Sequence, residues 1–79
     1  MNMFTTQLDI NYETPKSEVV KFALEHMCEA TLITENGPGG GNPVYEFSSH
    51  SYDCLEELVT QVYGVACDEE FLKTIIVEV

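Results

Sequence analysis

The sequence contains no arginine and no tryptophan, and its basic residues are three lysines against fourteen aspartates and glutamates. The formal net charge of the 79 residues is therefore −11. Proteins that bind nucleic acid neutralise phosphates with lysine and arginine, so we expect no direct nucleic-acid binding here. Such an excess of one sign opposes compaction by self-repulsion, which indicates that the charge serves solubility or a basic partner.

Long apolar runs are also missing, and none approaches the roughly 20 residues that a bilayer-spanning helix requires. The first residues lack the basic segment and apolar stretch of a secretory signal. A strongly negative protein is also repelled by anionic lipid headgroups. We therefore expect no membrane association and a cytoplasmic location, which means the host cytoplasm if the protein is viral.

Paired cysteine motifs are a third absence. The three cysteines, Cys28, Cys54 and Cys67, are odd in number and irregularly spaced, unlike a disulfide framework. Tight Cys-x-x-Cys or His-x-x-x-His pairs, which are usual in structural zinc sites, are missing too. We predict no catalytic residue, no metal and no cofactor. The alternative is a small enzyme or metal protein that uses Cys54 and His50, which lie one helical turn apart in sequence.

What is present is typical of a folded domain. Apolar residues make up 44% of the chain, with four phenylalanines and four tyrosines, which is too rich for a disordered acidic tail. A chain of this length is predicted to form one domain, residues 1–79.

Alternation of apolar and polar residues at 4–12 predicts a half-buried strand. Shorter segments at 29–35, 44–48 and 74–79 predict three more strands. Residues 68–70 open either a short helical turn or a loop. The segment 36–43 is rich in glycine, asparagine and proline, which predicts a mobile hairpin tip. It lacks the Lys-Ser/Thr ending of a phosphate-binding loop.

Two segments have the features of amphipathic helices. Thr14-Pro15 is a start signal for the first, while Ser49 or Ser51 is suited to cap the second and Gly64 to end it. Apolar residues recur at helical spacing in both: Val19, Val20, Ala23, Leu24 and Met27 in the first helix, and Leu55, Leu58, Val59, Val62 and Tyr63 in the second.

The predicted fold class is therefore α+β, with elements in the order β-α-β-β-α-β. The simplest packing is a four-stranded antiparallel sheet with two helices on one face, which is similar to the ferredoxin-like split βαβ arrangement.

The carboxylates are the candidate binding residues. In this arrangement Asp9, Glu46 and Glu78 share the sheet face away from the helices. Asp53, Glu56 and Glu57 form a second cluster on the outer side of the second helix. Neighbours on a helix lie roughly 5–6 Å apart, so spaced carboxylates approximate a row of phosphates.

The function predicted from these features is a small acidic protein-binding module. It would act as an inhibitor that occludes a basic nucleic-acid-binding site on a partner protein. In type, the chain resembles phage-encoded inhibitors that mimic nucleic acid, and immunity proteins and antitoxins that neutralise basic nucleases. The alternative is a structural or oligomer-forming accessory protein, a possible homodimer that pairs through an exposed strand edge.

Overall fold

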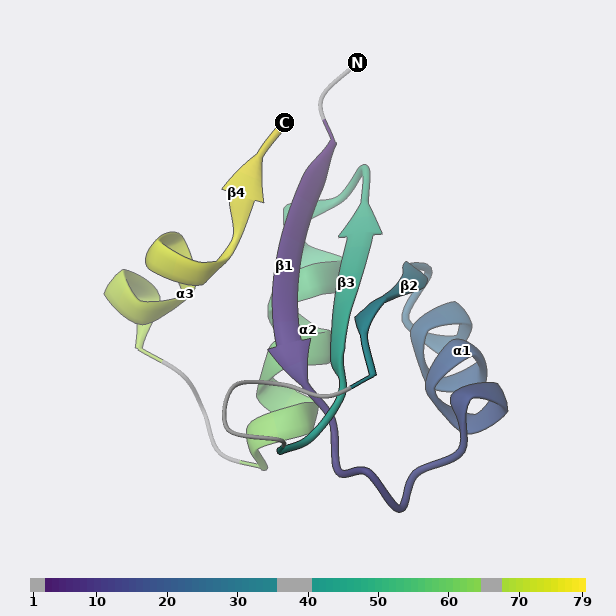
Figure 1. The fold of residues 1–79 in the computed structure, drawn as a ribbon. Helices are drawn as coiled ribbons and strands as arrows, with labels where there is room; N and C mark the ends of the chain where they lie inside the picture. Colours follow the sequence, from purple (N-terminus) through teal and green to yellow (C-terminus); the bar gives the residue numbers. More distant parts are fainter. Residues whose placement is uncertain (1–2, 36–40, 65–67) are drawn as a thin grey trace.

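The computed structural model describes residues 3–35, 41–64 and 68–79, and Figure 1 shows its fold. Within these residues the chain forms four strands and three helices, and the order of elements is β1 (Phe4–Asp9), α1 (Lys16–Glu25), β2 (Glu29–Thr34), β3 (Val44–Ser49), α2 (Tyr52–Tyr63), α3 (Glu69–Ile75) and β4 (Val77–Glu78). The predicted α+β class is confirmed.

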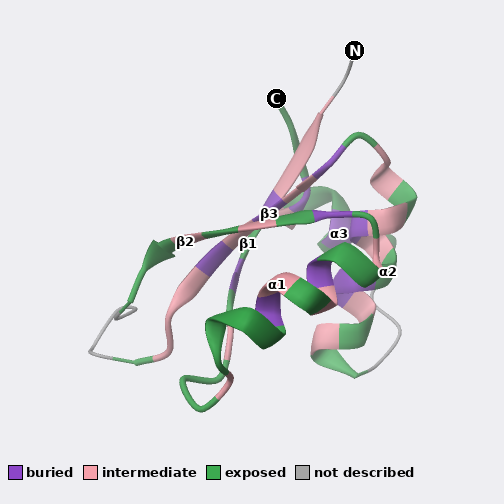
Figure 2. Ribbon diagram, turned by 90° about the vertical axis from the view of Figure 1, so that its right-hand side faces the viewer, coloured by how far each residue is buried: buried purple, intermediate pink, exposed green. Residues whose placement is uncertain are grey.

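The four strands form one antiparallel sheet in the order β2-β3-β1-β4. In the centre of the sheet Thr6 pairs with Phe47, and Phe47 pairs with Ala30 on its other side. The helices lie on one side of the sheet, as the edge-on view in Figure 2 shows.

The core fills the space between the sheet and the helices. Alternate residues of the central strands, including Leu8, Tyr45 and Phe47, point into it. They meet the apolar stripe of α2, where Leu55 and Leu58 are fully buried. The apolar residues at every second position of the strands and those at helical spacing in α2 thus pack in the same core.

The ends of α2 agree with the sequence signals. Of the two candidate caps, Ser51 is the one used, and its Oγ accepts a hydrogen bond from the N–H of Cys54 at 3.4 Å. Gly64 ends the helix with φ 73°, in the left-handed region that glycine adopts without steric cost. For α1, the cap position is taken by Pro15 and not by Thr14, and no side chain caps the helix.

The end of the chain differs from the prediction. The strand expected at 74–79 is limited to Val77–Glu78, because α3 occupies Glu69–Ile75. Helical spacing brings Leu72 and Ile76 together in the core, and the N–H of Ile76 donates to the carbonyl oxygen of Leu72 at 2.8 Å. Burial of this pair overrides the strand propensity of the β-branched residues.

The predicted glycine-rich tip at 36–43 lies partly outside the described residues, at 36–40. At its described base, Ile10 N–H donates to the carbonyl oxygen of Pro43 at 2.9 Å. The N–H of Tyr12 donates to the side-chain oxygen of Asn42 at 3.2 Å. These two bonds hold the base of the hairpin against the segment that follows β1.

One serine joins three elements. Ser49, the last residue of β3, is buried, and its Oγ donates to the carbonyl oxygen of Met27, just after α1, at 3.3 Å. The same oxygen accepts from the N–H of Ser51, the cap of α2, at 3.1 Å. The end of α1 and the start of α2 are thus held to the end of β3.

Helix α1 ends in a left-handed residue that is not glycine. Met27 has φ 58°. The N–H of Cys28 donates to the carbonyl oxygen of Ala23 at 2.8 Å, and that of Met27 to Leu24 at 3.0 Å. These two bonds form a Schellman motif, in which glycine usually takes the left-handed position. A side chain costs about 1–2 kcal/mol in this conformation.

We expect Met27→Gly to stabilise the fold, because it removes this strain while Met27, which is 79% exposed, loses little packing. The gain in unfolding free energy should be about 0.5–1 kcal/mol, since glycine also has more freedom to lose on folding. Urea unfolding measures it. Met27→Ala is the control, because it shortens the side chain but retains the Cβ; an equal gain from both variants would contradict the strain.

Candidate protein-binding surface

The sheet face that the helices leave uncovered carries three carboxylates. The strand alternation that buries Leu8 and Phe47 turns Asp9 and Glu46 to the other side, as predicted. Glu29 of β2 pairs with Ser48 and lies on this side as well. We call the residues Asp9, Glu29 and Glu46 the open-face acids.

The strand register places Gln7, Glu46 and Thr31 side by side at the centre of this face. Gln7 lies directly opposite Glu46, and its Nε2 donates to the Oε2 of Glu46 at 3.5 Å. Thr31 flanks Glu46 on the other side. The two cross-strand neighbours of this half-buried carboxylate are therefore neutral polar side chains, and no lysine of the described residues forms an ion pair with it.

The predicted placement of Glu78 on the open sheet face is wrong. Glu78 pairs with Phe4, whose side chain packs against the core, so Glu78 lies toward the helix side of the sheet edge. Val77 pairs with Thr5 and takes the open face, with 55% of its surface exposed. The reason is that Ile76, at the end of α3, is buried on the helix side. Because side chains alternate along a strand, Val77 then points to the open face and Glu78 to the helix side.

The predicted cluster on α2 lies on the opposite side of the molecule. Asp53 and Glu57 are exposed, one helical turn apart, while Glu56 is half-buried at the flank of the helix. The stripe of Leu55 and Leu58 faces the sheet, so these carboxylates point away from it. The six predicted residues thus lie in three places: Asp53, Glu56 and Glu57 on the outer side of α2, Asp9 and Glu46 on the open face, and Glu78 at the sheet edge.

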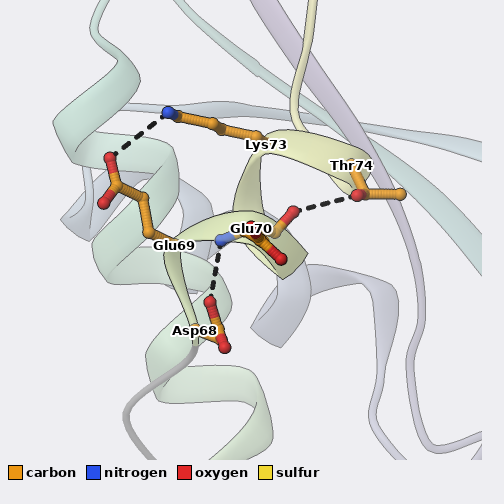
Figure 3. A network of polar contacts seen from close by, with 5 residues as sticks. All are labelled: Asp68, Glu69, Glu70, Lys73 and Thr74. Atoms are coloured by element: carbon orange, nitrogen blue, oxygen red, sulfur yellow. Dashed lines mark hydrogen bonds and ion pairs between the residues drawn. The ribbon is translucent and has the colours of Figure 1, made fainter.

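A third group of acids stands at the start of α3, where the sequence predicts a short helical turn or a loop (Figure 3). The Oδ1 of Asp68 caps the helix by accepting from the N–H of Glu70 at 2.9 Å. Glu69 pairs with Lys73 at 3.4 Å, and Thr74 donates to the carbonyl oxygen of Glu70 at 2.9 Å. The Asp-Glu-Glu run before an apolar residue was the sequence signal for this helix.

The two described cysteines differ in burial. Cys28 is buried, its Sγ donates to the carbonyl oxygen of His26 at 3.2 Å, and burial raises the pKa of the thiol. Cys54 is half-buried at the start of α2. Within the described ranges, no group of three or more histidine, cysteine, aspartate and glutamate side chains is placed to hold a metal ion. Cys67 lies outside the described residues.

The comparisons with known proteins add no relative: no family model, curated protein or solved structure matches the chain. None of the described helices is long and apolar enough to cross a membrane.

We expect the two described cysteines to differ in reactivity. Because burial disfavours its thiolate, Cys28 should react with iodoacetamide more slowly than Cys54 in the folded protein. Peptide mass spectrometry after timed alkylation measures both rates, and urea should make them equal. Equal rates in the folded protein would contradict the burial of Cys28.

The same raised pKa predicts a pH dependence. As pH rises above the ordinary pKa of a thiol, the unfolded chain loses the Cys28 proton while the folded chain retains it. The contribution of this group to stability is therefore complete below that pKa and decreases as pH rises toward the folded pKa. Cys28→Ala is the control, since it should weaken this alkaline decrease.

Proposed function

We propose that the chain is an acidic protein-binding module that occludes a basic, nucleic-acid-binding surface on a partner protein. The observation that carries the proposal is the exposure of its carboxylates. Twelve of the fourteen acidic residues are exposed, and the other two, Glu46 and Glu56, are half-buried. Since the acids lie outside the core and repel one another, their number favours an external, positively charged counterpart.

The open-face acids are the primary surface in this proposal. They stand on a sheet face without helices over it, and a partner can approach it without displacing a helix. The α2 cluster of Asp53, Glu56 and Glu57 is a second surface, and a rigid partner that covers one cannot also cover the other. Glu78 stands at the sheet edge between them.

We also infer that the fold is a variant of the ferredoxin-like arrangement. The strand order β2-β3-β1-β4 and the antiparallel pairing of all neighbours support this. Helix α3, which lies between α2 and the last strand, is the departure from that arrangement.

Self-association is the second candidate function. It is favoured by the apolar surface of the last residues, since Val77 is 55% and Val79 is 80% exposed. A dimer must overcome the repulsion between two chains of net charge −11. Sedimentation at low and high salt separates the cases, because a chain that remains monomeric in both would exclude it.

The proposed function predicts that the chain binds a basic protein and that DNA competes with the chain for that protein. Immobilised chain should retain a basic protein from lysate at low salt, and both added salt and duplex DNA should release it. With the purified partner, Asp9→Asn/Glu46→Gln should weaken binding by roughly tenfold if each carboxylate contributes up to about 1 kcal/mol.

Two double variants with the same change in charge serve as controls. Asp53→Asn/Glu57→Gln tests the α2 cluster, and Glu13→Gln/Glu18→Gln tests acids of the α1 region. Equal weakening by all three would indicate attraction by net charge alone and contradict an open-face site. If duplex DNA displaces none of the retained proteins, the proposed function is wrong.

A further inference from the structure

One edge of the sheet is only partly paired. The N–H of Val79 donates to the carbonyl oxygen of Met3 at 2.8 Å, and Thr5 pairs with Val77. On the other side of β1, Ile10 N–H donates to Pro43. The backbone N–H and C=O groups of successive residues in an antiparallel strand point to opposite neighbours. In β1, the backbone groups of odd-numbered residues therefore point toward β4, and those of even-numbered residues point toward β3.

Strand β4 ends before it covers this edge. It pairs with Phe4 and Thr5, and α3 takes the residues that would continue the ladder. Figure 1 shows β4 beside the start of β1 only. The backbone N–H and C=O groups of Gln7 and Asp9 therefore face outward, and no residue of the described ranges bonds to them. Such a row of groups is a template for an added strand.

A groove runs beside this edge. It has a volume of ≈ 360 Å³ and is lined by Thr5, Thr6, Gln7, Ile75 and Val77. Thr6 is buried, with 2% of its surface exposed, and in the described part of the structure its Oγ1 has no hydrogen-bond partner. The groove thus combines a strand edge without a paired neighbour, apolar side chains and the buried Thr6 hydroxyl, which has no hydrogen-bond partner in the described residues.

The charge around the groove is mainly negative. Asp9 ends the unpaired stretch, and Glu46 lies next to Gln7 across the strand. Glu78 lies opposite Phe4 at the other end. On the nearby helix α3, Lys73 is paired with Glu69 at 3.4 Å. A segment entering the groove therefore meets uncompensated carboxylates on its flanks.

We propose that this groove binds an extended, basic segment of the partner protein as an added strand next to β1. The segment forms main-chain hydrogen bonds with Gln7 and Asp9, its apolar residues contact Ile75 and Val77, and its lysine or arginine residues face Asp9 and Glu46. This inference rests on the proposed function and specifies the element that is bound. The other edge strand, β2, is less suited because its ladder is irregular between Leu32 and Thr34.

A labelled peptide of alternating lysine and valine tests the proposal. Fluorescence anisotropy should detect binding to the full chain, and the same peptide N-methylated at every residue should bind at least roughly tenfold more weakly. N-methylation retains every charge but removes the N–H groups that a ladder needs. In amide NMR spectra, the unmodified peptide should protect Gln7 and Asp9 from hydrogen exchange.

Matched protein variants test the same edge. Gln7→Pro removes an N–H that faces away from β3 and should weaken peptide binding by roughly tenfold, whereas Gln7→Ala retains this N–H and should bind like the original chain. Asp9→Asn should reduce both affinity and salt dependence without altering the β1 backbone. It therefore keeps the test valid if the proline variant does not fold.

The contrary outcomes are distinct. Equal binding of the methylated peptide would overturn strand addition but leave an acidic binding module. Absence of binding by both the peptide and any basic protein would overturn the proposed function as well. Protection of the Gln7 and Asp9 amides from hydrogen exchange in the peptide-free chain would also overturn the inference. If this protection increases with protein concentration, a second copy of the chain occupies the groove. If it does not, residues 73–75 of the same chain occupy it.

Discussion

The pairing of β1 with β3 is the constraint on which the rest of the structure depends. These strands are far apart in sequence and lie side by side in the sheet centre, with Leu8 opposite Tyr45 and Gln7 opposite Glu46. The first pair belongs to the core and the second to the open face. A shift of one residue in one strand would bring Glu46 into the core and expose Tyr45 and Phe47, so burial and charge select the same register.

Much of the fold follows from local pattern. The strand at β1, the cap at Ser51 and the stop at Gly64 depend on features within a few residues, and the structure contains all of them. Helix α3 illustrates what local pattern leaves open. Residues 74–79 have the composition of a strand, yet contact of Leu72 and Ile76 with the core makes their first part helical. That contact depends on tertiary packing, which residue propensity does not describe.

The residues of the candidate surface also fall into two groups, those that local pattern places and those that tertiary packing places. Alternation along β1 and β3 was enough to place Asp9 and Glu46 on the open face. Glu78 was misplaced because its side depends on where α3 ends. The α2 carboxylates lie opposite the open face because the helix packs on the other side of the sheet, which the predicted arrangement contained but which residue pattern alone does not specify. The unpaired edge of β1 is likewise visible only once the sheet order is known.

The hydroxyl of Ser49 has a consequence for how the domain opens. It binds the backbone just after α1 and the cap residue of α2, while its own backbone belongs to β3. Separation of α1 or of α2 removes one of the two hydrogen bonds of this oxygen, and separation of β3 removes both. The hydroxyl therefore couples the opening of β3 to that of the end of α1 and the start of α2, and we expect these three segments to open together more readily than any one of them frays alone.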